Sequence, residues 1–142
     1  MSLPAPRRAA LLAACPLFRG VGPDGIAALA GRATEVDFPA GHVIARQGEI
    51  GTGFFVVVAG SVRVVRDAVV LASLGPGEFF GELSVLDGRP RNAMVAAETA
   101  TTCLAIASWD FEAILLANPA LALAILRGLA ARLREATEAI RH

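Results

Sequence analysis

A glycine, a glutamate and an arginine occur in an order that suits binding of a small anion with hydroxyl groups. Gly81 and Glu82 stand where a short helix is expected to start, and Arg91 follows at the head of a strand-like run. A helix start offers unpaired backbone N–H groups and a partial positive charge to a phosphate. An arginine adds a charged, planar fork for the same oxygens, and a carboxylate accepts hydrogen bonds from a sugar hydroxyl. Together these groups favour a ribose phosphate ligand.

Length and composition favour a single domain, residues 1–142, with a buried core. Although 55% of the residues are hydrophobic, Arg or Gly interrupts the apolar runs, so no membrane span is expected. The formal net charge is zero, and we therefore expect no binding of nucleic acid by this chain alone. We also expect a cytoplasmic protein, because the apolar run after Arg8 is too short for a good signal peptide.

The two cysteines, Cys15 and Cys103, lie far apart in the sequence. Neither has neighbours at the spacing of a metal site, and we expect both to be small buried apolar groups. The chain has two histidines, one of them the terminal residue. We therefore expect no metal.

The residue pattern divides the chain into three zones. Residues of about 5–32 have a helical period, residues of about 33–107 form short β-branched and aromatic runs between glycines, and the helical period returns over about 108–141. We predict an α+β fold, an antiparallel β jelly roll (double-stranded β-helix) flanked by N-terminal helices and C-terminal helices. The expected strands are Val36–Phe38, His42–Arg46, Phe54–Val58, Val62–Val65, Val69–Leu74, Asn92–Ala96 and Thr101–Ala107.

Turn and capping residues predict where several elements begin and end. A short helix is expected after Gly22 or Asp24 as its N-cap, and Arg66–Ala68 is expected to be a tight hairpin tip. Ser108 is expected to cap a helix, and Asn118 is expected to cap the last one. One apolar stripe is predicted along the last helix: Leu121, Ile125, Leu129, Leu133, Ala136 and Ile140.

Taken singly, each residue of the motif has an ordinary structural explanation. Gly81 suits a turn, Glu82 suits the first turn of a helix, and Arg91 suits a solvated surface or an ion pair. Their ordered combination is what favours a binding site.

The segment from Phe80 to Ser84, followed by the segment from Pro90 to Val95, closely resembles the phosphate-binding cassette of cyclic nucleotide-binding domains. This family includes the catabolite activator protein, the regulatory subunits of protein kinase A and cyclic nucleotide-gated channels. The resemblance covers about residues 11–141. Its other motifs, in the family's order, are Cys15–Phe18, Pro39–Ile44, Gln47–Glu49, Phe54–Val57 and Gly60–Val62.

The resemblance implies a role for each residue of the cassette. Gly81, Leu83 and Ser84 would present backbone or hydroxyl donors to the cyclic phosphate. Glu82 would accept a hydrogen bond from the ribose 2′-hydroxyl, and Arg91 would pair with the exocyclic phosphate oxygens.

Asn92 would lie beside the arginine, where relatives often have a small or hydroxyl-bearing residue. Because asparagine departs from that pattern, it leaves the choice of nucleotide open, and we favour cAMP over cGMP on family frequency. Val64 and Val43 are candidate wall residues, with ordinary core as the alternative. Arg132 and Thr137 lie where relatives contact the base or latch the pocket, with a solvated helix face as the alternative.

The resemblance implies a regulatory module that binds cAMP or cGMP and moves its C-terminal helices, and no enzyme. A metal-dependent enzyme on a similar scaffold is disfavoured by the shortage of histidines. The module can also be the sensor domain of a cAMP-responsive transcription regulator or of an ion channel, with the effector part outside this chain. An interaction module without a ligand is disfavoured by the joint presence of Gly81, Glu82 and Arg91. A homodimer through the last helix and packing of that helix on its own chain both remain open.

Overall fold

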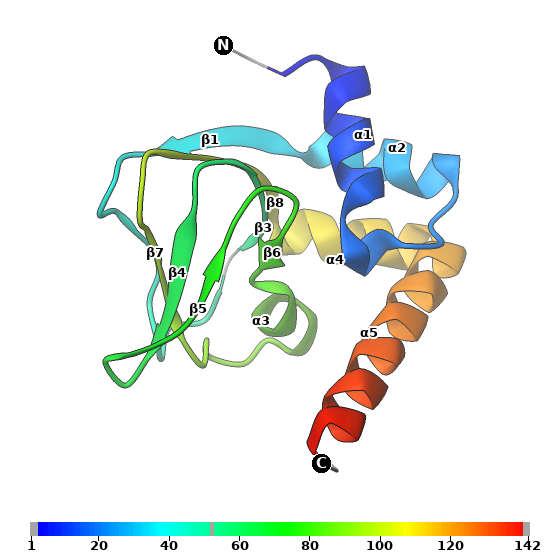
Figure 1. Cartoon of the computed structure of the whole chain (residues 1–142). Helices are drawn as coiled ribbons and strands as arrows, with labels where there is room; N and C mark the ends of the chain where they lie inside the picture. The colour runs from blue at the N-terminus through cyan, green and yellow to red at the C-terminus, as the bar shows by residue number, and fades with distance from the viewer. Residues whose placement is uncertain (1–2, 52, 141–142) are drawn as a thin grey trace.

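The computed structural model describes residues 3–51 and 53–140, except for the side chains of Leu83 and Ile140. Its strands form a β-roll, and helices from both ends of the chain gather on one side of it (Figure 1). The N-terminal and C-terminal helices contact each other there, although they are farthest apart in the sequence. The predicted α+β class, an antiparallel jelly roll flanked by helices, is confirmed.

Three short helical elements precede the strands: α1 (Ala5–Ala14), the 3-10 helix η1 (Pro16–Phe18) and α2 (Pro23–Arg32). Gly22 is the N-cap of α2 and Pro23 is its first residue, which is one of the two predicted starts. Proline suits this position because it has no N–H to leave unpaired and its φ angle is already helical.

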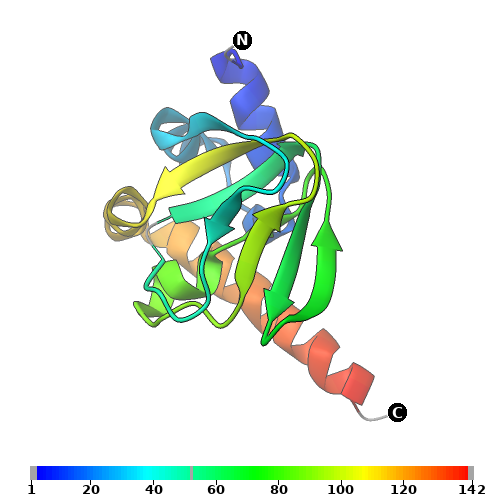
Figure 2. The same ribbon diagram turned by 90° about the vertical axis from the view of Figure 1, so that its left-hand side faces the viewer.

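The roll consists of two four-stranded antiparallel sheets, with strand orders β1-β8-β3-β6 and β2-β7-β4-β5. Figure 2 shows strands of the second sheet side by side at the front of the roll. The first sheet comprises β1 (Thr34–Phe38), β3 (Gly53–Ala59), β6 (Phe79–Phe80) and β8 (Thr101–Ala107). The second comprises β2 (Val43–Ala45), β4 (Val62–Arg66), β5 (Val69–Leu74) and β7 (Met94–Ala97).

The predicted strands match the observed ones closely in the hairpins and less well near the binding motif. β5 and β8 have the predicted bounds, whereas β7 begins two residues later than expected, at Met94. The strand β6 was not predicted, because its two residues, Phe79–Phe80, are too few to show an alternating pattern. A short helix, α3 (Glu82–Asp87), connects β6 to the loop before β7, as the motif predicted.

The hairpin between β4 and β5 turns at Asp67 and Ala68, both with positive φ angles, 51° and 66°. Two positive φ angles match the twist of the flanking strands and make a tight two-residue turn. The predicted tip at Arg66–Ala68 is confirmed. Gln47 holds this tip, because its amide group donates to the Asp67 carboxylate (2.8 Å) and accepts from the Asp67 N–H (3.0 Å).

The strand β3 connects two hydrophobic clusters, because successive side chains of a strand point to opposite faces. Phe54 and Val56 belong to the cluster between the roll and the helices, whereas Val57 belongs to the cluster inside the roll. The ring of Phe54 contacts those of Phe18 and Phe111 at centroid distances of 5.4 and 5.6 Å. The helices are therefore packed directly on the strand that leads to the site.

Both cysteines are free and buried, as predicted. Cys15 is 1% exposed in the helical cluster, and Cys103 is fully buried in β8. Burial raises the pKa of Cys15 to about 11 and that of Cys103 to about 12. Both are therefore protonated thiols at neutral pH and behave as small apolar groups.

The C-terminal zone contains α4 (Ser108–Ala117) and α5 (Pro119–Ile140). The prediction that Ser108 caps α4 is wrong: Ala107 is the N-cap, and no side-chain hydrogen bond is made there. The helix follows β8 directly, so that Ser108 is already its first helical residue. Asn118 begins α5 as predicted through its carbonyl, but its side chain donates to the carbonyl of Ile114 (2.9 Å) at the end of α4.

Only the first half of the predicted apolar stripe on α5 is buried. Leu121 and Ile125 are 3% and 2% exposed, and Leu129 is partly buried. Leu133 is 69% exposed because the second half of α5 extends away from the roll (Figure 1). The side chain of Ile140 and residue 141 lie outside the described residues.

Within the described part of the chain, no single helix is long and apolar enough to cross a membrane. α4 and α5 pass such a test only as a pair, and they are bent by 112° between Ala117 and Pro119.

Two leucines of α5 test how strongly this helix is anchored. Leu121→Ala leaves a cavity in the helical cluster, and we expect it to lower the free energy of unfolding by about 2–5 kcal/mol. Leu123→Ala, at a position 46% exposed on the same helix, should cost less than about 1 kcal/mol. Urea unfolding of both variants provides the comparison, and equal losses would contradict the packing of α5 described here.

Candidate functional site

A pocket of about 420 Å³ opens at the side of the roll where α3 lies. Its walls come from β4, the end of β5, β6, α3, the loop before β7, and β7. It contains most of the cassette that the sequence singled out. The lining residues are Val64, Leu74, Phe79, Phe80, Gly81, Glu82, Ser84, Asp87, Arg89, Pro90, Arg91, Asn92, Ala93 and Val95.

Gly81 is the N-cap of α3 and has a φ angle of 92°, which favours glycine. It also lies too close to its neighbours for any side chain. A Cβ atom there would be 2.6 Å from the Gly53 carbonyl oxygen and 3.0 Å from Nη1 of Arg91. The glycine is thus a turn residue, and it also brings the start of α3 next to the arginine.

The guanidinium group of Arg91 lies against the backbone at the start of β3. Its Nη2 donates to the carbonyl oxygen of Gly53 at 2.9 Å, and a Cβ atom at Gly51 would be 2.6 Å from three guanidinium atoms. The side chain is half-buried, and this burial lowers the pKa of Arg91, while the charge of Glu82 opposes the change. Because arginine stays protonated in proteins, the site contains a fixed positive charge beside Gly81.

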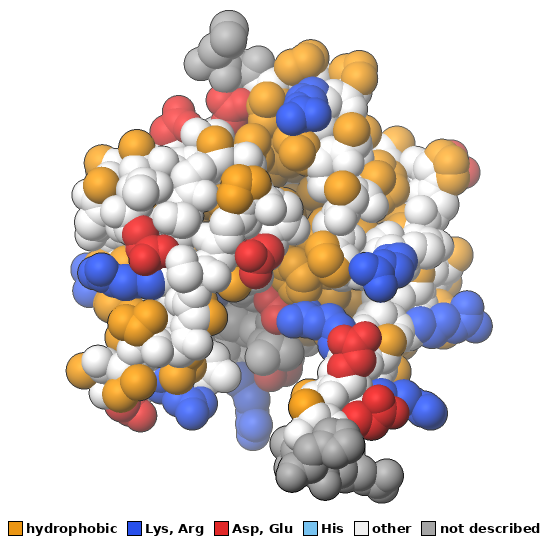
Figure 3. All heavy atoms as spheres, viewed as in Figure 1, with side chains coloured by type: hydrophobic (Ala, Val, Ile, Leu, Met, Phe, Trp, Pro, Cys, Tyr) orange, Lys and Arg blue, Asp and Glu red, His pale blue; other side chains and the backbone are white. Residues whose placement is uncertain are grey.

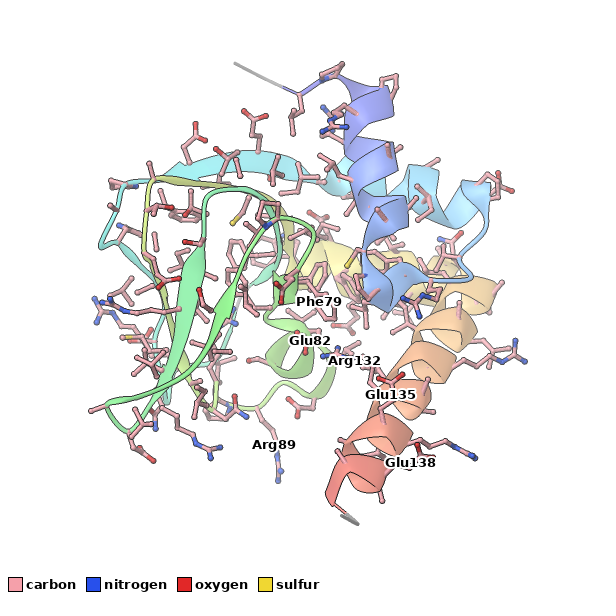
Figure 4. All side chains as sticks on the ribbon, in the orientation of Figure 1. Phe79, Glu82, Arg89, Arg132, Glu135 and Glu138 are labelled. Carbon is pink, nitrogen blue, oxygen red and sulfur yellow. The ribbon has the colours of Figure 1, made fainter. Side chains whose placement is uncertain are left out.

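The carboxylate of Glu82 lies between the pocket and α5. Its side chain is 14% exposed, and its Oε1 is 3.9 Å from Nη1 of Arg132. The guanidinium group of Arg132 also lies over the ring of Phe79, 4.7 Å from its centroid. Figure 4 shows Glu82 and Arg132 pointing toward each other across the space between α3 and α5, whereas Arg89 extends away from the body.

Burial raises the pKa of Glu82, and three nearby groups oppose that rise: its own backbone N–H, Arg132 and Arg91. A partly desolvated carboxylate has few water molecules to pair with. It is therefore well placed to accept a hydrogen bond from a ligand hydroxyl.

Some of the other predicted site residues line the pocket and some do not. Asn92 and Val64 line the pocket, with Asn92 exposed. Ser84 also lines it, although only 6% of this residue is exposed. The side chain of Leu83 lies outside the described residues.

Val43 and Thr137 lie outside the pocket wall. Thr137 is exposed near the end of α5, and its hydroxyl donates to the carbonyl of Leu133 at 2.9 Å. Its predicted contact with the ligand stays a prediction.

Side chains of both charges line the pocket: Glu82, Asp87, Arg89 and Arg91. On the face in Figure 3, acidic and basic side chains lie along α5, and hydrophobic side chains gather over the N-terminal helices. Among the described residues, no three His, Cys, Asp or Glu side chains are grouped closely enough to hold a metal ion.

A comparison with protein families finds a match to the model described as "Cyclic nucleotide-binding domain" over residues 35–118. This range is more than half of the chain and includes the whole cassette. The chain belongs to the cyclic nucleotide-binding domain family.

Relatives of this domain occur in proteins of different kinds. The chain is 41% identical over 112 residues to a cyclic nucleotide-gated potassium channel of Mesorhizobium japonicum, an alignment that covers 79% of this chain and 31% of the channel. It is 37% identical over 132 residues to a CRP-like cAMP-activated global transcriptional regulator of Mycobacterium tuberculosis, covering 87% of this chain and 58% of that protein. The chain thus spans less than two thirds of the length of either relative.

A solved structure has the same architecture. The catabolite activator protein of Thermus thermophilus superimposes on this cyclic nucleotide-binding domain with a TM-score of 0.76 and 35% identity, covering 89% of this chain and 62% of that one.

Sequence reasoning missed Gly51 and Gly53 as part of the site. They hold the arginine of the cassette although they lie 40 and 38 positions before it in the chain. Their close spacing at the start of a strand was a visible signal, but nothing local indicated which side chain they face. Phe79 was missed as well, because aromatic residues next to a strand are ordinary core.

The raised pKa of Glu82 makes a prediction for the ligand-free protein. A carboxyl group whose pKa is raised on folding stabilises the fold below its unfolded pKa, near 4.5, and this contribution is lost as pH rises through the folded pKa. We therefore expect the stability of Glu82→Gln relative to the unchanged protein to increase as the pH rises above 4.5, where the carboxyl group of the unchanged protein loses its proton on unfolding.

Urea unfolding at several pH values measures this difference. Glu112→Gln, at an exposed position of α4, controls for the loss of one negative charge. If the free energies of unfolding of Glu82→Gln and the unchanged protein differ by the same amount at every pH, the burial of Glu82 is contradicted.

Proposed function

We propose that this chain is a regulatory module that binds a cyclic nucleotide, cAMP in preference to cGMP, and that binding shifts its C-terminal helices. The observation that carries this proposal is the convergence of Arg91, Gly81 and Glu82 on one pocket. These groups complement a singly charged phosphate and a ribose hydroxyl.

Each residue of the cassette has a defined role in this proposal. Arg91 pairs with the exocyclic phosphate oxygens, and the backbone N–H groups of Gly81, Leu83 and Ser84 point to the same phosphate. Glu82 accepts from the ribose 2′-hydroxyl. The apolar wall formed by Val64, Leu74 and Val95 would cover the base.

The preference for cAMP is supported by the names of relatives. The regulator of Mycobacterium tuberculosis is called cAMP-activated, and a second relative, from Thermus thermophilus, is a cyclic AMP receptor protein, 36% identical over 126 residues. Asn92, which can both donate and accept hydrogen bonds, gives no preference by itself.

Coupling to the C-terminal helices is supported by the position of Arg132. This arginine of α5 contacts both Glu82 and Phe79, which line the pocket. A ligand hydroxyl that engages Glu82 would compete with Arg132 for the same carboxylate, and the neighbouring Leu133 of α5 is exposed and does not anchor the helix there. A ligand can shift α5 only through such a difference in contacts between two states.

The alternative is that the chain is the sensor domain of a cAMP-responsive transcription regulator or of an ion channel. The two kinds of relatives support this alternative equally, because both are longer than the chain. In either case the proposal includes no catalytic activity and a cytoplasmic location. A homodimer through the exposed leucines of α5 stays a proposal too.

Removal of Arg91 tests the proposal most directly. Arg91→Ala leaves the phosphate charge without its partner in a partly desolvated site, which should cost about 2–5 kcal/mol of binding free energy for cAMP. Calorimetric titration with cAMP, cGMP and non-cyclic AMP measures this loss. Arg63→Ala, an exposed arginine on β4, is the control, and near-normal affinity of the Arg91 variant would exclude the proposed role.

The role of Glu82 is tested with a ligand that lacks one hydroxyl. Glu82→Gln should weaken cAMP binding by about tenfold, because a neutral amide oxygen replaces the charged acceptor of the ribose hydroxyl. The same variant should bind 2′-deoxy-cAMP as well as the unchanged protein does, since that ligand has no hydroxyl to donate. Equal losses for the two nucleotides would show that Glu82 does not contact the ribose.

A further inference from the structure

The hydroxyl group of Ser84 connects two backbone segments that are distant from each other in the sequence. It accepts a hydrogen bond from the N–H of Gly51 at 2.8 Å and donates to the carbonyl of Arg89 at 2.6 Å. The residue is buried, with 6% of its surface exposed. A hydroxyl has one hydrogen, and Arg89 receives it here, so this hydrogen is not available to a phosphate.

The two segments also pair with each other directly. The N–H of Arg91 donates to the carbonyl of Glu49 at 2.7 Å, and the N–H of Gly48 donates to the carbonyl of Arg91 at 2.8 Å. Next to them, on the side of Gly51 and Arg89, Ile50 and Pro90 form an isolated antiparallel bridge. Residues 48–51 and 89–91 therefore lie side by side as a short antiparallel pair, and the serine hydroxyl connects them at one end. The second segment contains Arg91, and the first leads to Gly53, which accepts its hydrogen bond.

The orientation of the guanidinium group depends on the segment that contains Gly51 and leads to Gly53. Arg91 donates to the carbonyl of Gly53, and Gly51 leaves only enough space for the guanidinium to lie flat against the backbone. A shift of Gly51 therefore moves both the surface on which the guanidinium lies and the segment that carries its acceptor. Within this loop, the side chain that fixes Gly51 belongs to Ser84.

We infer that Ser84 is a positioning residue that orients Arg91 through its hydroxyl, and that its contribution to nucleotide binding goes through the arginine. This inference rests on the proposed function, and it goes further by separating two roles of one residue. The backbone N–H of Ser84 faces the phosphate in that proposal, whereas its hydroxyl holds the loop under the guanidinium. Such support for a charged ligand-binding group limits its motion before the ligand arrives.

A double-mutant cycle with Arg91 tests this inference. Ser84→Ala should weaken cAMP binding about tenfold, as expected for the loss of one or two hydrogen bonds that hold the loop. Arg91→Lys keeps the charge but lacks the forked donors, so Ser84→Ala added to it should change the affinity by less than about twofold. An equal loss in both backgrounds would overturn the inference, because a merely structural role acts in both.

A second measurement does not require nucleotide. The side-chain Nε–H signal of Arg91 in a ¹⁵N NMR spectrum of the ligand-free protein reports whether the guanidinium is held. We expect this signal to broaden or shift in Ser84→Ala and to stay unchanged in Ser73→Ala, which removes an exposed hydroxyl bonded to Glu98. An Arg91 signal unaffected by Ser84→Ala would contradict the positioning role.

The two measurements separate failure of this inference from failure of the proposed function. If the unchanged protein binds neither cAMP nor cGMP, the proposed function is wrong and the NMR signal still decides the positioning role. If Ser84→Ala is too unstable for titration, Ser84→Cys provides the same comparison, because its thiol occupies a similar space but donates and accepts weakly.

Discussion

The site depends on one constraint: a partly desolvated guanidinium group lies directly against the backbone of glycine residues. Arg91 donates to the carbonyl of Gly53, and the nearby positions 51 and 81 have no room for a side chain. A half-buried positive charge is costly unless its donors are paired. The glycines therefore let the backbone come close enough to pair with it, and the remaining donors can face a ligand.

The strand β3 connects this constraint to the rest of the fold. It starts at Gly53 in the site, and its next residues alternate between the helical cluster and the inside of the roll. Phe54 is fully buried among aromatic rings of η1 and α4. The same strand thus fixes the acceptor of Arg91 and anchors the helices, so that the site and the helical layer share one rigid element.

Glu82 forms the other connection, between the pocket and α5. Burial raises its pKa, and two arginines from different elements oppose this rise. Arg91 comes from the loop before β7 and Arg132 comes from α5, so one carboxylate is influenced by both the site and the helix. A group with two alternative partners can transmit occupancy of a pocket to a helix whose outer half has little packing of its own.

The sequence by itself determined the local elements and the identity of the cassette. The runs Val69–Leu74 and Thr101–Ala107 and the turn at Arg66–Ala68 were predictable, because side-chain period and turn chemistry act over a few neighbouring residues. Only the tertiary structure decided that Gly51 and Gly53 hold Arg91, that the Ser84 hydroxyl faces backbone, and that Leu133 is exposed. The contacts of Gly51 and Gly53 depend on the pairing of segments 33 to 40 residues away in the sequence, and the exposure of Leu133 depends on where α5 packs against η1 and α4. No local pattern specifies either.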